Sequence, residues 1–76
     1  YSSETGFTCE SDEEADLKKA CIQQASKVVL LMDSSKVGRR GTFRICDLED
    51  IDILVSDGNL PGDLLRRCAD CGVEVL

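Results

Sequence analysis

Residues 28–36 read Val-Val-Leu-Leu-Met-Asp-Ser-Ser-Lys, and the prediction of the fold starts from them. Val28 to Met32 are all apolar and show no alternation, which is typical of a strand covered on both faces in a parallel sheet. The run is far shorter than the roughly 20 residues that cross a bilayer, so no membrane span is expected. The polar residues from Asp33 onward would mark the carboxyl end of the strand, where parallel α/β sheets bind ligands.

The residues before this strand predict a helix. Ser11 and Glu14 have the spacing of a capping box, in which each side chain satisfies a backbone N–H group at the start of a helix. Leu17, Cys21 and Ala25 recur at intervals of four residues and are expected to form the buried stripe of that helix.

The residues after the strand predict three strands and one further helix. Residues 42–45 alternate between polar and apolar side chains and indicate a short strand with one buried face. Residues 53–55 form a compact apolar strand, and a helix is expected over residues 60–71, with Gly72 at its C-cap and a final strand from residue 73. We therefore predict an α/β fold with a partial, Rossmann-like parallel sheet and right-handed crossovers.

Size and composition indicate one small folded domain. The chain has 76 residues, of which 42% are hydrophobic and 32% are charged, so its core is expected to be marginal. Its formal charge of −6 disfavours direct contact with nucleic acid. The sequence contains no linker or repeat, and because it starts at Tyr1 we expect residues 1–76 to be an excerpt of a longer protein.

The five cysteines are interpreted as free thiols in a reducing cytoplasm. Cys21 and Cys68 fall on predicted apolar helix faces, where an unpaired thiol behaves as a small hydrophobic group. Cys68 and Cys71 form one CxxC pair at the end of a helix, and the chain contains no histidine. We therefore expect neither a zinc site nor a thioredoxin-like redox centre, and no cofactor.

Residues 34–46 reverse the charge of this acidic chain, because they contain four cations and no carboxylate. Cations, hydroxyls and flexible glycines at the end of a strand are the components of a phosphate site. The cations are Lys36, Arg39, Arg40 and Arg44, the hydroxyls include Ser34 and Ser35, and the glycines are Gly38 and Gly41.

A second interpretation of this basic segment is a solvated loop whose arginines pair with nearby carboxylates. Asp47, Glu49 and Asp50 follow closely enough to serve as partners. Arg39 and Arg40 are adjacent, so their side chains should diverge and at most one of them should enter a site.

Three motifs resemble the sensor domain of DeoR-type bacterial repressors of sugar metabolism. Met32 to Arg39 is similar to that family's A-D-x-S-K-F/V-G stretch. Gly6 to Thr8 together with Glu14 to Lys18 resembles its G-x-T and E-A-x-V/L-K motifs, and Leu48 to Asp57 resembles L-x-D/E-I-D-x-L/V-I/V-T/S-D. The resemblance extends over nearly the whole chain.

This resemblance implies a fold similar to that of ribose-5-phosphate isomerase and a phosphorylated sugar bound at the sheet edge. It also implies a cytoplasmic homo-oligomer that binds operator DNA through an N-terminal helix-turn-helix module. That module and the start of the sensor domain are absent from residues 1–76. The chain would then be the C-terminal part of a sensor domain in a transcription repressor.

Matching the motifs position by position gives the candidate effector site. Asp33, Ser35 and Lys36 match the D-x-S-K core, and Val37 stands where the family commonly has phenylalanine. The predicted site comprises Asp33, Ser34, Ser35, Lys36, Gly38 and Arg39, with Gly6 and Thr8 near the pocket entrance.

Two other functions are weighed against the sensor. A phosphosugar isomerase could use Asp33 and Lys36 for proton transfer, but the chain has no histidine and no GxSxG nucleophile motif. A dimerisation segment without a ligand is the other alternative. We predict a regulator and not an enzyme.

Overall fold

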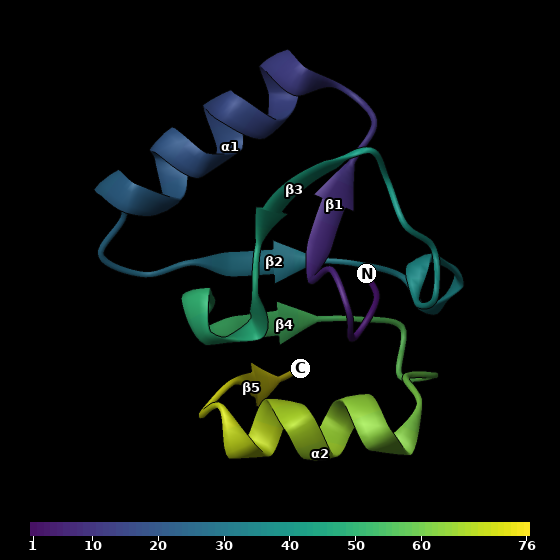
Figure 1. Cartoon of the computed structure of the whole chain (residues 1–76). Helices are drawn as coiled ribbons and strands as arrows, with labels where there is room; N and C mark the ends of the chain where they lie inside the picture. Colours follow the sequence, from purple (N-terminus) through teal and green to yellow (C-terminus); the bar gives the residue numbers. More distant parts are fainter.

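The computed structural model describes residues 1–76 and contains two helices and five strands (Figure 1). Two 3₁₀ turns, Ser34–Lys36 and Leu48–Asp50, follow β2 and β3 respectively. The elements are β1 (Phe7–Cys9), α1 (Asp12–Gln24), β2 (Val29–Leu31), β3 (Phe43–Cys46), β4 (Ile53–Val55), α2 (Gly62–Asp70) and β5 (Glu74–Val75).

Three strands form the predicted parallel sheet, in the order β2-β4-β5. Leu30 pairs with Leu54, and Leu54 pairs in turn with Val75, so one row of apolar side chains crosses the sheet. Strand β4 lies in the centre and β2 lies at one edge. The α/β class with a parallel sheet is therefore confirmed.

Strand β3 forms where alternation predicts a strand, but it lies outside the parallel sheet. It pairs antiparallel with β1, a strand of three residues that the sequence did not indicate. Gly41 allows this pairing, because a Cβ atom there would lie 2.6 Å from the carbonyl oxygen of Cys9. The Gly41 N–H also donates to Thr8 Oγ1 at 2.6 Å.

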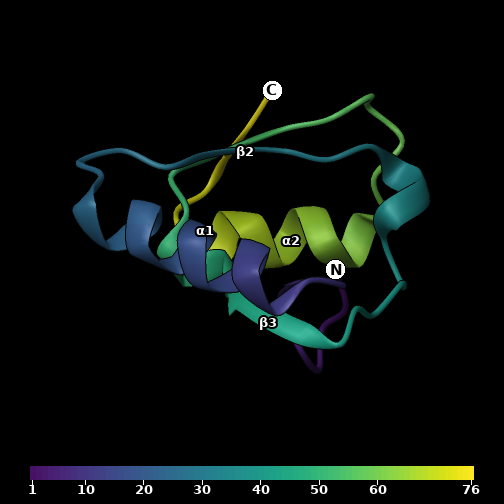
Figure 2. The same cartoon turned by 90° about the horizontal axis from the view of Figure 1, so that it is seen from above.

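One hydrophobic cluster forms the core, between the parallel sheet, α2 and the β1-β3 pair. Figure 2 shows α1, α2 and β3 on the same side of the parallel sheet. Leu54 of β4 and Cys68 of α2 are completely buried within the cluster, and Leu48 is 1% exposed. The core therefore lies on one face of the parallel sheet only.

The expectation that β2 is covered on both faces is wrong. Val28, Leu30 and Met32 pack against the core, whereas Val29 and Leu31 on the other face are 51% and 76% exposed. No segment of the chain lies over this outer face of the sheet (Figure 2).

The Ser11 half of the predicted capping box forms at the start of α1, but the predicted buried stripe of the helix is wrong. Ser11 Oγ accepts a hydrogen bond from the Glu14 N–H at 3.3 Å. Ala15 is buried, whereas Leu17 is 65% exposed and Cys21 is exposed as well. The helix packs on β1 and β3, and these contacts turn the Ala15 side of the helix inward. Neither α1 nor α2 has the length and apolar character that a membrane-spanning helix needs.

Candidate functional site

The carboxyl ends of β2 and β4 bring two aspartates to the same edge of the parallel sheet. Asp33 Oδ1 accepts a hydrogen bond from the Ser35 hydroxyl and one from the Ser35 N–H at 2.9 Å. Asp57 Oδ2 accepts one from the Ser34 hydroxyl at 2.9 Å and one from the Ser34 N–H at 3.2 Å. The turn after β2 is therefore held by carboxylates from both strands.

Hydrogen bonding favours the ionised form of both carboxyl groups. The Ser35 hydroxyl is the main cause that lowers the pKa of Asp33. The pKa of Asp57 is lowered mainly by the hydrogen bond from the Asn59 backbone N–H. The hydrogen bonds from the Ser34 N–H and the Ser34 hydroxyl lower it further. Both groups are fully exposed, so each adds negative charge to the edge of the sheet.

Asp57 was not among the predicted site residues, although its position could have indicated it. It follows an apolar strand, as Asp33 does, and the carboxyl ends of parallel strands meet at one edge of a sheet. Its partners Ser34 and Asn59 are 23 and two residues away in sequence. The pairing of β2 with β4 brings Asp57 close to Ser34, and sequence spacing does not reveal that pairing.

Two of the four cations of the basic segment form ion pairs, and the other two do not. Arg40 forms an ion pair with Glu4 at 3.3 Å, and Arg44 forms one with Asp47 at 2.9 Å. Lys36 and Arg39 form no ion pair. The solvated-loop interpretation therefore holds for Arg40 and Arg44, and two cations are left available for a ligand.

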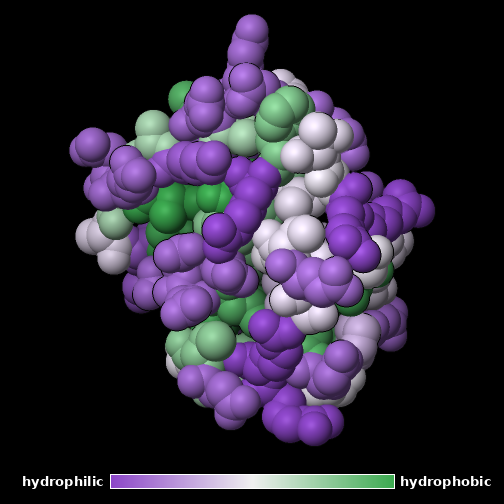
Figure 3. All heavy atoms as spheres, viewed as in Figure 1, coloured by the Kyte–Doolittle hydropathy of each residue, from purple (hydrophilic) through white to green (hydrophobic).

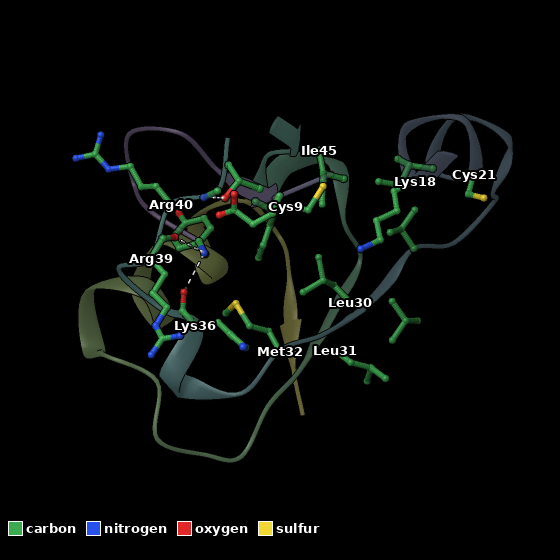
Figure 4. Close-up of a pocket in the computed structure, with 18 of the residues that line it drawn as sticks. Cys9, Lys18, Cys21, Leu30, Leu31, Met32, Lys36, Arg39, Arg40 and Ile45 are labelled. Atoms are coloured by element: carbon green, nitrogen blue, oxygen red, sulfur yellow. Dashed lines mark hydrogen bonds between the residues drawn. The ribbon is translucent and has the colours of Figure 1, made fainter. Parts of the chain in front are cut away.

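A cavity of about 930 Å³ runs between β2 on one side and α1, β1 and β3 on the other. Figure 3 shows apolar side chains reaching the surface between α1 and β2, with hydrophilic residues around them. Lys36, Arg39 and Arg40 lie at one end of the cavity (Figure 4). The side chains of Arg39 and Arg40 point in different directions there, as their adjacent positions predict.

Three of the predicted site residues line this cavity, and the others do not. Lys36, Arg39 and Thr8 contribute to its wall. The acidic and hydroxyl side chains of Asp33, Ser34 and Ser35 lie at the sheet edge described above. The structure thus divides the predicted site between a polar sheet edge and the cationic end of an apolar cavity.

The two predicted site glycines shape the backbone. Gly38 has φ +88°, and its N–H donates to the Tyr1 carbonyl oxygen at 2.7 Å, so it permits the turn as expected. Gly6 does not line the cavity. It has φ +74° and packs against β3, where a Cβ atom would lie 2.5 Å from the Cys46 carbonyl oxygen. Gly6 therefore has a packing role against β3.

All five cysteines are free, and they differ in burial. Cys46 and Cys68 are buried as small hydrophobic groups, and burial raises the pKa of the Cys46 thiol to about 11. Cys21 and Cys71 are exposed, so the expectation that Cys21 is buried is wrong. No three cysteine or carboxylate side chains lie close enough together to hold a metal ion.

Comparison with known proteins gives one matching family. The model of the DeoR C terminal sensor domain matches residues 1–58. The chain is 38% identical over 73 residues to the HTH-type transcriptional regulator GlpR of Haloferax volcanii, covering 96% of this chain and 29% of the relative. It is 40% identical over 78 residues to the HTH-type transcriptional repressor GlcR of Bacillus subtilis, covering 97% of this chain and 29% of the relative.

A third relative is the putative aga operon transcriptional repressor of Escherichia coli O157:H7, 32% identical over 73 residues. That alignment covers 96% of this chain and 27% of the relative. The chain thus spans less than a third of the length of each of these relatives. All three are named as transcriptional regulators or repressors and none as an enzyme, in agreement with the prediction from the sequence.

Proposed function

The chain belongs to the family of DeoR C-terminal sensor domains, and from this membership we propose that it is the effector-sensing part of a transcription regulator. The effector would be a phosphorylated sugar bound at the carboxyl end of the parallel sheet. One observation carries this proposal: Lys36 and Arg39 stay free of acidic partners at the cationic end of the cavity, whereas Arg40 and Arg44 are paired.

The charged and hydroxyl residues of the predicted site each have a role in this proposal. Lys36 and Arg39 bind the phosphate through charge-assisted hydrogen bonds, each contributing roughly 1.5–3 kcal/mol. The hydrogen bonds from Ser35 go to Asp33 Oδ1, and Asp33 Oδ2 accepts hydrogen bonds from sugar hydroxyls. Ser34 and Ser35 fix the turn that carries Lys36, and Thr8 lies on the cavity wall opposite β2.

Binding would act through the rest of a longer regulator. Residues 1–76 would be the C-terminal part of a sensor domain that is similar in fold to ribose-5-phosphate isomerase. A cytoplasmic homo-oligomer would contact operator DNA through a separate N-terminal module. The effector would shift this oligomer between two states, with a coupling free energy of typically about 1–3 kcal/mol, and no bond would be broken.

A thermal-shift titration tests the effector site. Pentose and hexose phosphates are added to the chain, with the unphosphorylated sugars as controls. A ligand at 100 times its Kd should stabilise the protein by roughly 2.7 kcal/mol. Lys36→Ala and Arg39→Ala should abolish the shift, and the unphosphorylated sugars should give none.

Arg40→Ala is the matched control, because Arg40 is adjacent in sequence and its guanidinium is paired with Glu4. This variant should keep the phosphosugar shift. If Lys36→Ala and Arg39→Ala responded like the unmodified chain, the phosphate site would lie elsewhere. Isomerisation of any of these phosphosugars would instead favour an enzyme.

A further inference from the structure

The part of the basic segment from Lys36 to Arg39 has few anchors of its own. Only Val37 packs against the core there, and the other three residues are exposed. The turn that precedes them is held by the carboxylates of Asp33 and Asp57, as described above. The residues that follow this turn need another anchor.

Tyr1 supplies that anchor through its backbone. Its nitrogen donates to the carbonyl oxygen of Lys36 at 3.0 Å and to that of Arg39 at 3.1 Å. Its own carbonyl oxygen accepts a hydrogen bond from the Gly38 N–H at 2.7 Å. No other residue outside positions 33–39 forms a hydrogen bond with residues 36–39. The backbone of both unpaired cations is therefore attached to the rest of the fold through Tyr1.

The side chain of Tyr1 fixes the position of this backbone. Tyr1 is only 7% exposed and belongs to the hydrophobic core. Its ring lies against that of Phe7, with the ring centroids 4.8 Å apart and the ring planes tilted by 50°. Burial raises the pKa of the Tyr1 hydroxyl, which is also close enough to Arg67 of α2 to be influenced by that charge. The ring therefore ties residue 1 to the core between β1 and α2.

The hydroxyl group of Tyr1 adds nothing to this anchor. It is buried and has no hydrogen-bond partner. A buried hydroxyl without a partner destabilises a fold, because it has lost its hydrogen bonds to water. The anchor is therefore the aromatic ring, and phenylalanine should replace tyrosine without loss.

We propose that Tyr1 is a positioning residue of the effector site: its buried ring holds the backbone of residues 36–39 and so sets where Lys36 and Arg39 meet a phosphate. This inference rests on the proposed function, in which these two cations bind the phosphate group of a sugar. Both lie at the end of the cavity that Tyr1 also lines (Figure 4). Long cationic side chains lose conformational freedom when they bind, so a fixed backbone lowers the cost of binding.

Isothermal titration calorimetry, carried out below the Tm of every variant, tests this role. The probes are inorganic phosphate and the pentose and hexose phosphates of the thermal-shift titration. Tyr1→Ala should weaken the binding of these probes by roughly tenfold or more, because it releases the backbone of both cations. Tyr1→Phe should bind them as the unmodified chain does, and it should keep or raise the Tm.

Ile51→Ala is the matched control for lost core packing. Ile51 is 4% exposed and precedes the amino end of β4, at the opposite end of the sheet from the turn after β2. This variant should lower the Tm and leave the Kd unchanged. If it weakened binding as much as Tyr1→Ala does, general loss of stability would explain both losses and the proposal would be overturned. Loss of binding in Tyr1→Phe would also overturn it, because the hydroxyl and not the ring would then be responsible.

Amide hydrogen exchange gives a measurement that needs no phosphosugar. The Gly38 N–H donates to the Tyr1 carbonyl oxygen, whereas the Met32 N–H donates to the Val55 carbonyl oxygen at the end of the sheet. Tyr1→Ala should speed the exchange of the Gly38 amide relative to that of Met32 by roughly tenfold, and Tyr1→Phe should leave this ratio unchanged. An unchanged ratio in Tyr1→Ala would mean that the ring does not hold residues 36–39.

The two measurements separate this inference from the proposed function. If none of the phosphates binds the unmodified chain, the proposed function fails, and the Gly38 exchange ratio still decides whether Tyr1 holds residues 36–39. If Tyr1→Ala frees Gly38 but leaves the Kd unchanged, the effector site stands and its positioning by Tyr1 is wrong. If Tyr1→Ala fails to fold, Tyr1→Leu takes its place, because it keeps apolar bulk without the aromatic ring. It should show both losses to a smaller extent, and no loss in either measurement would overturn the proposal.

Discussion

Gly6 combines a left-handed backbone conformation with a close approach to β3. Its φ is +74°, and a Cβ atom would lie 2.5 Å from the Cys46 carbonyl oxygen. Alanine there would therefore suffer backbone strain and a clash with main-chain atoms. We expect Gly6→Ala to lower the free energy of unfolding by about 3 kcal/mol or more, measured by urea denaturation with circular dichroism.

Two other glycines separate the causes of this loss. Gly58 has φ +88° with open space around it, so Gly58→Ala should cost only the strain of about 1–2 kcal/mol. Gly62 has neither a positive φ nor a close neighbour, so Gly62→Ala should be neutral or stabilising by up to about 1 kcal/mol. Equal losses for Gly6→Ala and Gly58→Ala would show that the contact with Cys46 is relaxed in solution.

The ion-pair partners of single residues could be predicted from the sequence only in part. The basic segment identifies four cations, but their partners depend on contacts distant in sequence. Arg40 pairs with Glu4 because the start of the chain is held beside the basic segment, where the Tyr1 nitrogen donates to the carbonyl oxygens of Lys36 and Arg39. Arg44 pairs with Asp47, which is three residues away. The first pairing cannot be read from spacing, and the second was among the partners considered. The availability of Lys36 and Arg39 therefore emerges only in three dimensions.

At the scale of elements, Asp57 fixes the turn after β2 to the end of β4. It accepts hydrogen bonds from the Ser34 N–H and hydroxyl, and its pKa is lowered mainly by the Asn59 N–H. A carboxyl group whose pKa is lowered by folding stabilises the fold above its unfolded pKa. That stabilisation is lost as the pH falls through the lower, folded value.

We therefore expect Asp57→Asn to lower the Tm near neutral pH, with a difference from the unmodified chain that shrinks below about pH 3.8. Thermal unfolding followed by circular dichroism between pH 7 and the acid range measures this difference. Asp16→Asn is the control, because Asp16 is exposed on α1 and its carboxylate accepts no hydrogen bond. A Tm difference for Asp57→Asn that stays constant with pH would contradict the role of its charge.

Elements with strong local signals were predicted well from the sequence. The Ser11 cap and the helical spacing of residues 60–71 correspond to α1 and α2, and the apolar runs correspond to β2 and β4. Strand β1 was missed because its three residues, Phe7–Cys9, have too short a pattern and form a strand only against β3. The buried face of α1 was predicted wrongly. The stripe with Leu17 is the more apolar one, but the contacts of the helix with β3 bury the face with Ala15 instead.

At the scale of the whole molecule, the parallel sheet divides apolar side chains between a core and a bare face. Leu54 on the inner face is completely buried, whereas Leu31 on the outer face of the neighbouring strand is 76% exposed. The apolar run Val28 to Met32 predicts burial on both faces, as in complete parallel sheets. Residues 1–76 cover only the inner face of the strand, and the outer face that carries Leu31 stays exposed.

These two leucines lie on neighbouring strands of one sheet and form a matched pair for mutation. Leu54→Ala removes packing from the centre of the core and should lower the free energy of unfolding by about 2–5 kcal/mol. Leu31→Ala in the 76-residue chain should change it by less than about 0.5 kcal/mol, because most of the side chain already contacts water. Urea denaturation of both variants measures the contrast, and comparable losses would show that the outer face is covered in the isolated chain.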